Sequence, residues 1–292
     1  MSRIQYAVAR REWRFKDVCE DCASVNAVSE QKFVGVVVDG HANEKVSDSA
    51  MASAAFSSYV SDALAHNLSV QNPFASEDGM HRAFDTVAQM VGFGTRGGHF
   101  DPRVGAVAGA VCVDVLRHKL TVAYAGDVRL YANVRAGKSF RCFTMDHTPK
   151  HPGELDRLRP LLTDKSFEVV YHSLSTFGSE GPFVPRLHYR QEDGARSTAG
   201  LMVTRGFGDK LFQPAFTHTP DVHEIHLNGM YHDAVFALCS DGAQRNLGRL
   251  FQRYQKCGVP DTLEPLVESF YELHEEENDD DATVLFFRLL AD

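Results

Sequence analysis

Acidic residues stand directly at the ends of apolar runs, where a carboxylate could be held rigidly at the edge of a core. Asp39 follows the run Phe33–Val38, Asp241 follows the run AVFALCS, and Asp280 and Asp281 precede the run ATVLFFRLL. Clustered carboxylate oxygens are the ligands that hard divalent cations such as Mg²⁺ and Mn²⁺ prefer. If these runs are strands of one sheet, their acids meet at one edge of the sheet. The pattern then predicts a site for divalent cations.

Each acid taken alone has a simpler interpretation. Asp39-Gly40 is also the commonest hairpin dipeptide, and a single acid at a strand end is more often a turn or a cap than a ligand. A further candidate, Asp127, lies in the turn of AYAGDVRL. Three or four carboxylates in one place repel one another unless a cation neutralises them, so clustering itself would indicate a metal.

The elements that must position these acids follow from the apolar pattern. Phe33–Val38 is short, largely β-branched and nearly free of polar residues, as expected of a buried central strand. We expect further strands at 4–10, near 19–25, and at 105–116, 120–125, 129–134, 200–204, 222–227, 234–240 and 282–290. The strands between 105 and 134 are expected to form a meander.

Helical spacing of apolar residues appears between the strands. Helices are predicted at 44–68, at about 77–91, at 152–162, and as an amphipathic pair after Asp241. In the 152–162 helix, Glu154 and Arg157 are expected to be exposed. Strands and helices are grouped rather than strictly alternating, so the fold class is α+β and not a βαβ repeat.

Composition limits the classes of function. The chain has 292 residues, of which 43% are hydrophobic and 24% charged, and its net charge is −9. This suits one domain over 1–292. The negative charge argues against a nucleic-acid backbone as the main partner and is compatible with binding cations. No apolar run is long enough to cross a membrane and no signal peptide is evident, so an intracellular location, cytoplasmic or nuclear, and a monomer are expected. Residues 163–198 have weak periodicity, which is typical of a flap over a site.

Seven short motifs, in order along nearly the whole chain, resemble those of the protein phosphatase 2C class of metal-dependent Ser/Thr phosphatases. The most specific is Asp39-Gly40-His41. The others are CED at 19–21, AYAGDVR at 123–129, FTMDHTP at 143–149 with Glu154 and Arg157 after it, LMVTRGFGD at 201–209, ALCSDG at 237–242 and DDATV at 280–284. One such motif is weak evidence, but seven in order are strong.

The resemblance implies a fold and a metal site. The fold would be a sandwich of two antiparallel β-sheets flanked by helix pairs, with a flap at about 163–198. Two Mn²⁺ or Mg²⁺ ions would lie at the edge of the sheets, with Asp39 between them. The ligands that the resemblance implies are Asp39, Gly40 through its carbonyl, Asp241 and Asp280, with Glu20 and Asp21 acting mainly through water and Asp127 at a third position.

The resemblance also implies a reaction on phosphoprotein substrates. Two cations lower the pKa of a water molecule, which then attacks phosphorus in line with the leaving Ser or Thr oxygen. His41 would protonate that oxygen. An arginine would bind the phosphate oxygens, and we assign Arg14; Lys16 is the alternative because its spacing to Glu20 fits the family motif better.

Some positions depart from the family pattern. Gln244 and Arg245 stand where the family usually has Trp and Asp, and that Asp helps to hold a third ion together with the residue matching Asp127. We therefore expect a third ion to bind weakly or not at all. Asp281 replaces an Asn, which adds charge near the metals. Two alternatives stay open: an inactive pseudophosphatase that keeps the fold for binding, and a hydrolase of small phosphorylated molecules.

Overall fold

A computed structural model describes residues 3–13, 18–42, 49–70, 77–93, 100–134, 139–173, 183–191, 193–231, 234–258, 260–276 and 280–290. Arg14 and Lys16, the two candidates for the phosphate contact, lie outside the described residues. So does the expected start of the first helix at 44–48.

The sequence of the central strand β3 (Lys32–Ala42) is largely apolar because both faces of the strand are buried. Phe33 and Val37 point into a core between two sheets. Val34, Val36 and Val38 point the other way, against helices. Since side chains alternate along a strand, a strand covered on both faces needs a continuous apolar run. The prediction of a buried central strand is confirmed.

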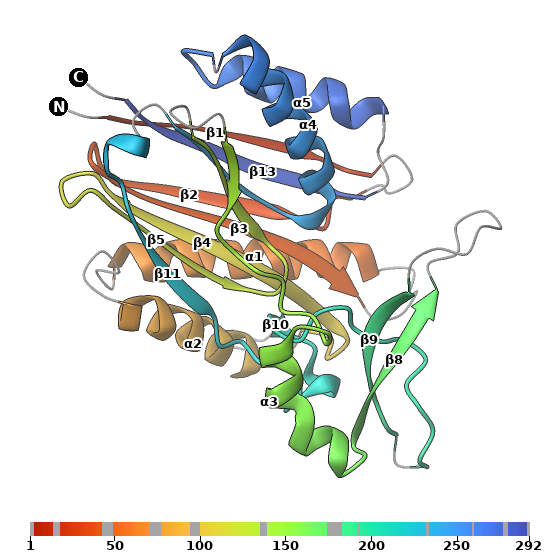
Figure 1. The fold of residues 1–292 in the computed structure, drawn as a ribbon. Helices are drawn as coiled ribbons and strands as arrows, with labels where there is room; N and C mark the ends of the chain where they lie inside the picture. The colour runs from red at the N-terminus through yellow and green to blue at the C-terminus, as the bar shows by residue number, and fades with distance from the viewer. Residues whose placement is uncertain are drawn as a thin grey trace.

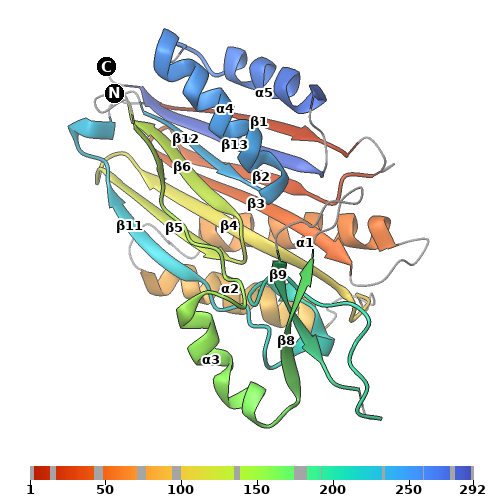
Figure 2. The ribbon, with the colours of Figure 1, turned by 45° about the vertical axis from the view of Figure 1, so that its right-hand side comes forward.

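Two antiparallel sheets face one another (Figures 1 and 2). The first has the order β1 (Arg3–Arg11), β13 (Ala282–Leu290), β12 (Val235–Cys239), β6 (Arg129–Val134) and β7 (Ser139–Cys142). The second has the order β11 (Asp221–His226), β5 (Lys119–Ala125), β4 (Val104–Asp114), β3 and β2 (Cys22–Ser29), with β10 (Phe207–Gly208) paired to β4.

Helix pairs cover the outer face of each sheet. Helices α1 (Ser49–Val70) and α2 (Glu77–Phe93) pack on the sheet that contains β3, and α4 (Asp241–Cys257) and α5 (Glu264–Glu276) pack on the other (Figure 1). The apolar stripes predicted for α2 and α4 are the buried faces of these helices. In α1 the predicted residues Phe56, Val60 and Leu64 are buried, but Met51 is 66% exposed, so that part of the predicted stripe is wrong. The expected sandwich with flanking helix pairs is confirmed.

The expected meander over 105–134 is wrong. β4 and β5 pair in the second sheet, but β6 pairs with β12 in the first sheet. The turn at Gly126-Asp127 therefore carries the chain from one sheet to the other. Gly126 has φ +110°, a conformation that favours glycine, and its missing side chain leaves room for Val107.

After β7, an edge strand of the first sheet, the chain forms α3 (Pro152–Thr163) and then a hairpin of β8 (Phe167–Ser173) and β9 (Phe183–Tyr189). This hairpin lies beside the C-terminal end of β3 in both views (Figures 1 and 2). The expected strand at 200–204 is wrong: only an isolated bridge joins Leu201 to Leu187.

Within the described residues, none of the helices has the length and apolar character that crossing a membrane requires.

Candidate metal centre

The acidic residues converge from both sheets rather than at the edge of one. Asp39 and His41 lie on the same face of β3 as Phe33 and Val37, so they continue the inner row to the end of the sandwich. Asp241 begins α4 directly after β12. The expectation of a single sheet edge is corrected, because the acids meet where the two sheets open.

Ser240 joins three of the motifs. Its hydroxyl donates to Asp21 Oδ2 at 2.7 Å and accepts from the backbone N–H of Thr283 at 2.9 Å. Its own backbone N–H donates to the carbonyl of Thr283. A Cβ on Gly242 would lie 3.1 Å from the Cβ of Asp280. The start of α4, the start of β13 and Asp21 therefore form one corner of the site.

Gly40 brings the N-terminal acids to Asp39. It is buried and pairs with Ala106 of β4. A Cβ at Gly40 would lie 2.6 Å from the carbonyl oxygen of Glu20. Glu20 itself is buried, with 8% of its surface exposed. The backbone of β3 and the segment that carries Glu20 and Asp21 are thus in direct contact.

Burial and mutual repulsion mark these carboxylates as a cluster. Burial raises the pKa of Asp39 well above its ordinary value, and the neighbouring charges of Asp21 and Asp241 raise it further. Burial and the same kind of repulsion, from Asp281 and Asp241, raise the pKa of Asp21 to about 7 despite the hydrogen bond from Ser240. Burial, then Asp241 and Asp146, raises the pKa of Asp127 to about 8.

The chemistry of this donor set fits divalent cations. Oxygen ligands are what Mg²⁺ and Mn²⁺ require, and a cation would remove the repulsion that raises these pKa values. Among the described residues, however, no three His, Cys, Asp or Glu side chains already converge closely enough to hold one ion. The carboxylates surround a common region and would have to close around an ion that binds there.

His41 is held by a residue that the motif analysis did not single out. His41 Nε2 lies 2.7 Å from Oδ2 of Asp209, which is fully buried. Burial opposes the charged imidazole, but the charge and hydrogen bond of Asp209 outweigh it and raise the pKa of His41. Gly105 makes the contact possible, since a Cβ there would overlap the Asp209 carboxylate. In the sequence, Asp209 was recognised only as the last residue of the motif LMVTRGFGD and was assigned no role.

Asp281 has a structural role in addition to the charge that it adds near the other acids. Its Oδ1 accepts the backbone N–H of Trp13 at 2.7 Å, and its Oδ2 accepts that of Glu20 at 2.9 Å. The carboxylate is 3% exposed. Asp281 therefore fixes the segment that carries Glu20 and Asp21, in addition to adding charge near them.

The turn that carries Asp127 is held from two sides. Gln244, at one of the departures from the family pattern, donates from Nε2 to the carbonyl of Asp127 at 3.1 Å. The buried His147 accepts the N–H of Gly126 through Nδ1 at 3.1 Å, and its Nε2 lies 3.1 Å from Asp221. His147 therefore helps to hold this turn in place.

The expectation that Glu154 is exposed is wrong. Its side chain is 1% exposed and accepts hydrogen bonds from Arg157, Arg205 and Thr204. Burial alone would raise the pKa of Glu154, but these three donors lower it to about 2. Through Arg205, Glu154 joins α3 to the segment that leads towards Asp209. Arg205 also pairs with Asp221, at the start of β11.

Comparison with known proteins supports the fold. The family model described as "Protein phosphatase 2C" matches residues 7–243. No protein of curated function matches the sequence.

Several solved structures are similar to this chain. A serine-threonine phosphatase 2C from Toxoplasma gondii is 16% identical with a TM-score of 0.67, and the match covers 98% of this chain and 95% of that one. The serine/threonine phosphatase PstP/Ppp of Mycobacterium tuberculosis is 17% identical with a TM-score of 0.59, covering 99% and 100%. A C. elegans sex determining protein is 17% identical with a TM-score of 0.66, covering all of this chain and 66% of that one. At these identities the likeness shows the fold alone.

Proposed function

Because the chain belongs to the protein phosphatase 2C family and has its fold, we propose that it is a metal-dependent protein serine/threonine phosphatase. The observation that carries this proposal is the meeting of Asp21, Asp39 and Asp127 with Asp241 between the two sheets. Burial and neighbouring carboxylates, Asp241 among them, raise the pKa values of Asp21, Asp39 and Asp127. Burying several unneutralised carboxylates together is unfavourable, so their clustering supports a bound cation that offsets their repulsion.

In this proposal the acids hold two Mn²⁺ or Mg²⁺ ions. Bound ions would neutralise the cluster, offset the charge of the phosphate and lower the pKa of a water molecule for attack on phosphorus. We assign Asp39, the Gly40 carbonyl, Asp241 and Asp280 as the ligands of these ions, with Glu20 and Asp21 acting mainly through water. We propose that a third ion at Asp127 is weak or absent, because Arg245 stands where the family has an acid.

His41 is proposed as the general acid. Its raised pKa favours the protonated ring, in which both nitrogens carry protons. Nε2–H donates to Asp209, so Nδ1–H remains for the oxygen of the leaving Ser or Thr. Asp209 fixes the plane of the ring and stabilises its charge.

The phosphate contact and the flap complete the proposal. Arg14, with Lys16 as the alternative, would bind the phosphate oxygens. The β8–β9 hairpin, within the expected flap at 163–198 of a single domain, lies beside the end of β3 and would contact the substrate protein (Figure 2).

The test is hydrolysis of a phosphothreonine peptide in EDTA, in Mg²⁺ and in Mn²⁺, by the wild type and by Asp241→Ala. Asp78→Ala, at an exposed carboxylate of α2, is the matched control. We expect activity that requires metal, is lost in Asp241→Ala and is retained in Asp78→Ala. Equal rates in EDTA and Mn²⁺, or full activity of Asp241→Ala, would refute the proposal.

A second candidate is a binding module without activity. It is favoured by Gln244 and Arg245, which stand where the family usually has Trp and Asp. No hydrolysis together with tight Mn²⁺ binding by calorimetry would support this candidate.

A further inference from the structure

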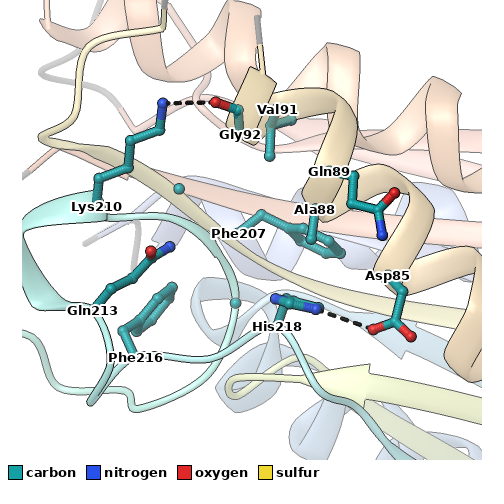
Figure 3. A pocket seen from close by; sticks show the side chains of 12 residues that line it. Asp85, Ala88, Gln89, Val91, Gly92, Phe207, Lys210, Gln213, Phe216 and His218 are labelled. Atoms are coloured by element: carbon teal, nitrogen blue, oxygen red, sulfur yellow. Dashed lines mark hydrogen bonds and ion pairs between the residues drawn. The ribbon is translucent and has the colours of Figure 1, made fainter.

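A cavity lies outside the acidic cluster, between α2 and the segment 206–218. It has a volume of about 340 Å³ (Figure 3). Phe207 and Phe216 line it from the loop, and Ala88 and Val91 line it from the helix. Both rings are at most 3% exposed, so the apolar lining is part of the fixed structure rather than a loose surface. A volume of this size suits a small molecule rather than a protein segment.

The polar groups around this α2 cavity leave one positive charge without an acidic partner. Oδ1 of Asp85 lies 3.0 Å from Nε2 of His218, which balances the charge of Asp85 only when the imidazole is protonated. Lys210 donates to the carbonyl of Gly92 at 3.3 Å, and in the described part of the chain it makes no ion pair with a carboxylate. An anion at the Lys210 end of the cavity would meet a cation that no acid compensates.

Two side-chain amides add to this polarity. Gln89 and Gln213 lie on opposite sides of the cavity (Figure 3). Neither amide has a side-chain hydrogen bond to another described residue. Amides can both donate and accept, so they can serve the oxygens of a carboxylate or a polar edge of a ring.

We propose that the α2 cavity binds a small aromatic carboxylate. Its ring would pack on Phe207 and Phe216, and its carboxylate would pair with Lys210. The alternative of a cationic ligand is disfavoured because Lys210 would repel it and because Asp85, the only carboxylate among the described lining residues, already contacts His218.

The cavity is joined by backbone to the general acid, and this consequence rests on the proposed function. Phe207, Gly208 and Lys210 all line the cavity, and Asp209 between them holds His41 at 2.7 Å. β10 is in turn paired with Gly105 and Ala106 of β4. A ligand that packs on this segment favours the arrangement in which Asp209 contacts His41. Occupancy should therefore raise kcat.

Binding is tested with naphthalene-2-carboxylate, followed by its own fluorescence and by calorimetry. The titration is made in EDTA, so that no metal ion in the acidic cluster can bind the carboxylate. We expect saturable binding by the wild type and by Arg82→Gln, an exposed charge on the same helix. Lys210→Gln should weaken binding about tenfold, the usual effect of losing one charge-assisted hydrogen bond. Ala88→Phe should abolish it by filling the cavity.

The outcomes separate the cavity from the phosphatase proposal. No binding by the wild type, or unchanged binding by both Lys210→Gln and Ala88→Phe, would overturn the cavity proposal whether or not the protein hydrolyses phosphopeptides. Lys210→Gln decides the question if Ala88→Phe does not fold. In Mn²⁺ with a phosphothreonine peptide, the ligand should raise kcat at least about twofold in the wild type and not in Ala88→Phe. Binding without any change in kcat would refute the link to His41.

Discussion

The contact between His41 and Asp209 depends on a residue that contributes no side chain. Gly105 lies opposite His41 in the sheet, and a Cβ there would overlap the Asp209 carboxylate and lie 2.7 Å from His41 Nε2. Since real Cβ atoms do not approach other atoms this closely, one of the two side chains would have to move.

Gly105→Ala should therefore separate His41 from Asp209. We expect kcat for a phosphothreonine peptide to fall about tenfold or more, corresponding to about 1.4 kcal/mol in the barrier. Mn²⁺ affinity, measured by calorimetry, should change little because no acid is altered. Gly248→Ala is the control, since a Cβ there meets nothing within 4 Å. Equal kcat values for the two variants would contradict the role assigned to Asp209.

Glu154 links stability to acid pH. Its pKa is lowered from 4.5 to about 2 by Arg205, Thr204 and Arg157, although burial alone would act in the opposite direction. A carboxyl with a lowered folded pKa stabilises the protein fully above its unfolded pKa and loses that contribution as the pH falls through the folded value.

The free energy of unfolding of the wild type should thus decline between pH of about 4.5 and about 2 because of Glu154. Glu154→Gln should be less stable at pH 7 by on the order of 2 kcal/mol and should lack this part of the pH dependence. Urea unfolding at several pH values measures both quantities. Glu272→Gln, at an exposed pair with Arg253, is the control. Parallel pH profiles for Glu154→Gln and the wild type would contradict the prediction.

At the scale of elements, the crossing turn between β5 and β6 sets the position of Asp127. Gly126 has φ +110°, and a Cβ there would lie 2.2 Å from Cγ1 of Val107. Gly194, with φ +81°, has a similar backbone conformation in open space. Alanine variants at the two glycines therefore separate the energetic cost of the backbone conformation from the cost of steric overlap.

Gly194→Ala should cost about 1 kcal/mol of stability, the usual penalty for a left-handed non-glycine residue. Gly126→Ala should cost about 2 to 4 kcal/mol, since overlap with Val107 is added. Urea unfolding of the two variants measures the difference. Equal losses would mean that Val107 moves aside freely.

Near the C-terminal end of the chain, Asp281 fixes the segment before β2. Asp281→Ala should speed hydrogen exchange at the amides of Trp13 and Glu20 by about tenfold or more, since each loses a hydrogen bond to a carboxylate. The amide of Ala9 in β1 is the internal control and should keep its protection. Unchanged exchange at both target amides would show that other contacts hold this segment.

Across the whole molecule, aromatic rings join the two sheets. Phe287 of β13 packs on Phe33 of β3 with 5.7 Å between ring centroids and stacks on Phe236 of β12 at 5.1 Å. All three rings are almost completely buried. Phe287→Ala should lower the free energy of unfolding by about 3–5 kcal/mol. Phe183→Ala, at a ring that is 66% exposed, should change it little. Urea unfolding measures both, and similar losses would contradict the prediction.

The parts of the fold that the sequence predicted were those set by local periodicity. The apolar run of β3 and the stripes of α2 and α4 were predictable because burial on one or two faces leaves a direct pattern in the chain. The acids Asp39 and Asp241 were found because each follows such a run. The ordered motifs then supplied the sandwich.

What the sequence did not predict depends on contacts between distant segments. The passage of β6 into the other sheet leaves no local signal, because a glycine turn can equally join neighbouring strands. Glu154 was expected to be exposed because its partner Arg205 lies 51 positions away. Asp209 was given no role beyond its place in a family motif, since only the folded chain shows that it reaches His41, 168 positions earlier.

The pairing of β1 with β13 has a consequence for protein synthesis. Arg3–Arg11 lies against Ala282–Leu290, and Glu20 donates to Asp281 across 261 positions. A ribosome makes the N-terminal partner long before the C-terminal one, and the nascent chain cannot assemble the acidic cluster until residues 280–290 have left the exit tunnel. During that interval β1 has no strand partner, and Asp21 lacks both Ser240 and the segment that positions it. The proposed cation site therefore cannot form before residues 280–290 are free to pair with the N-terminal strand.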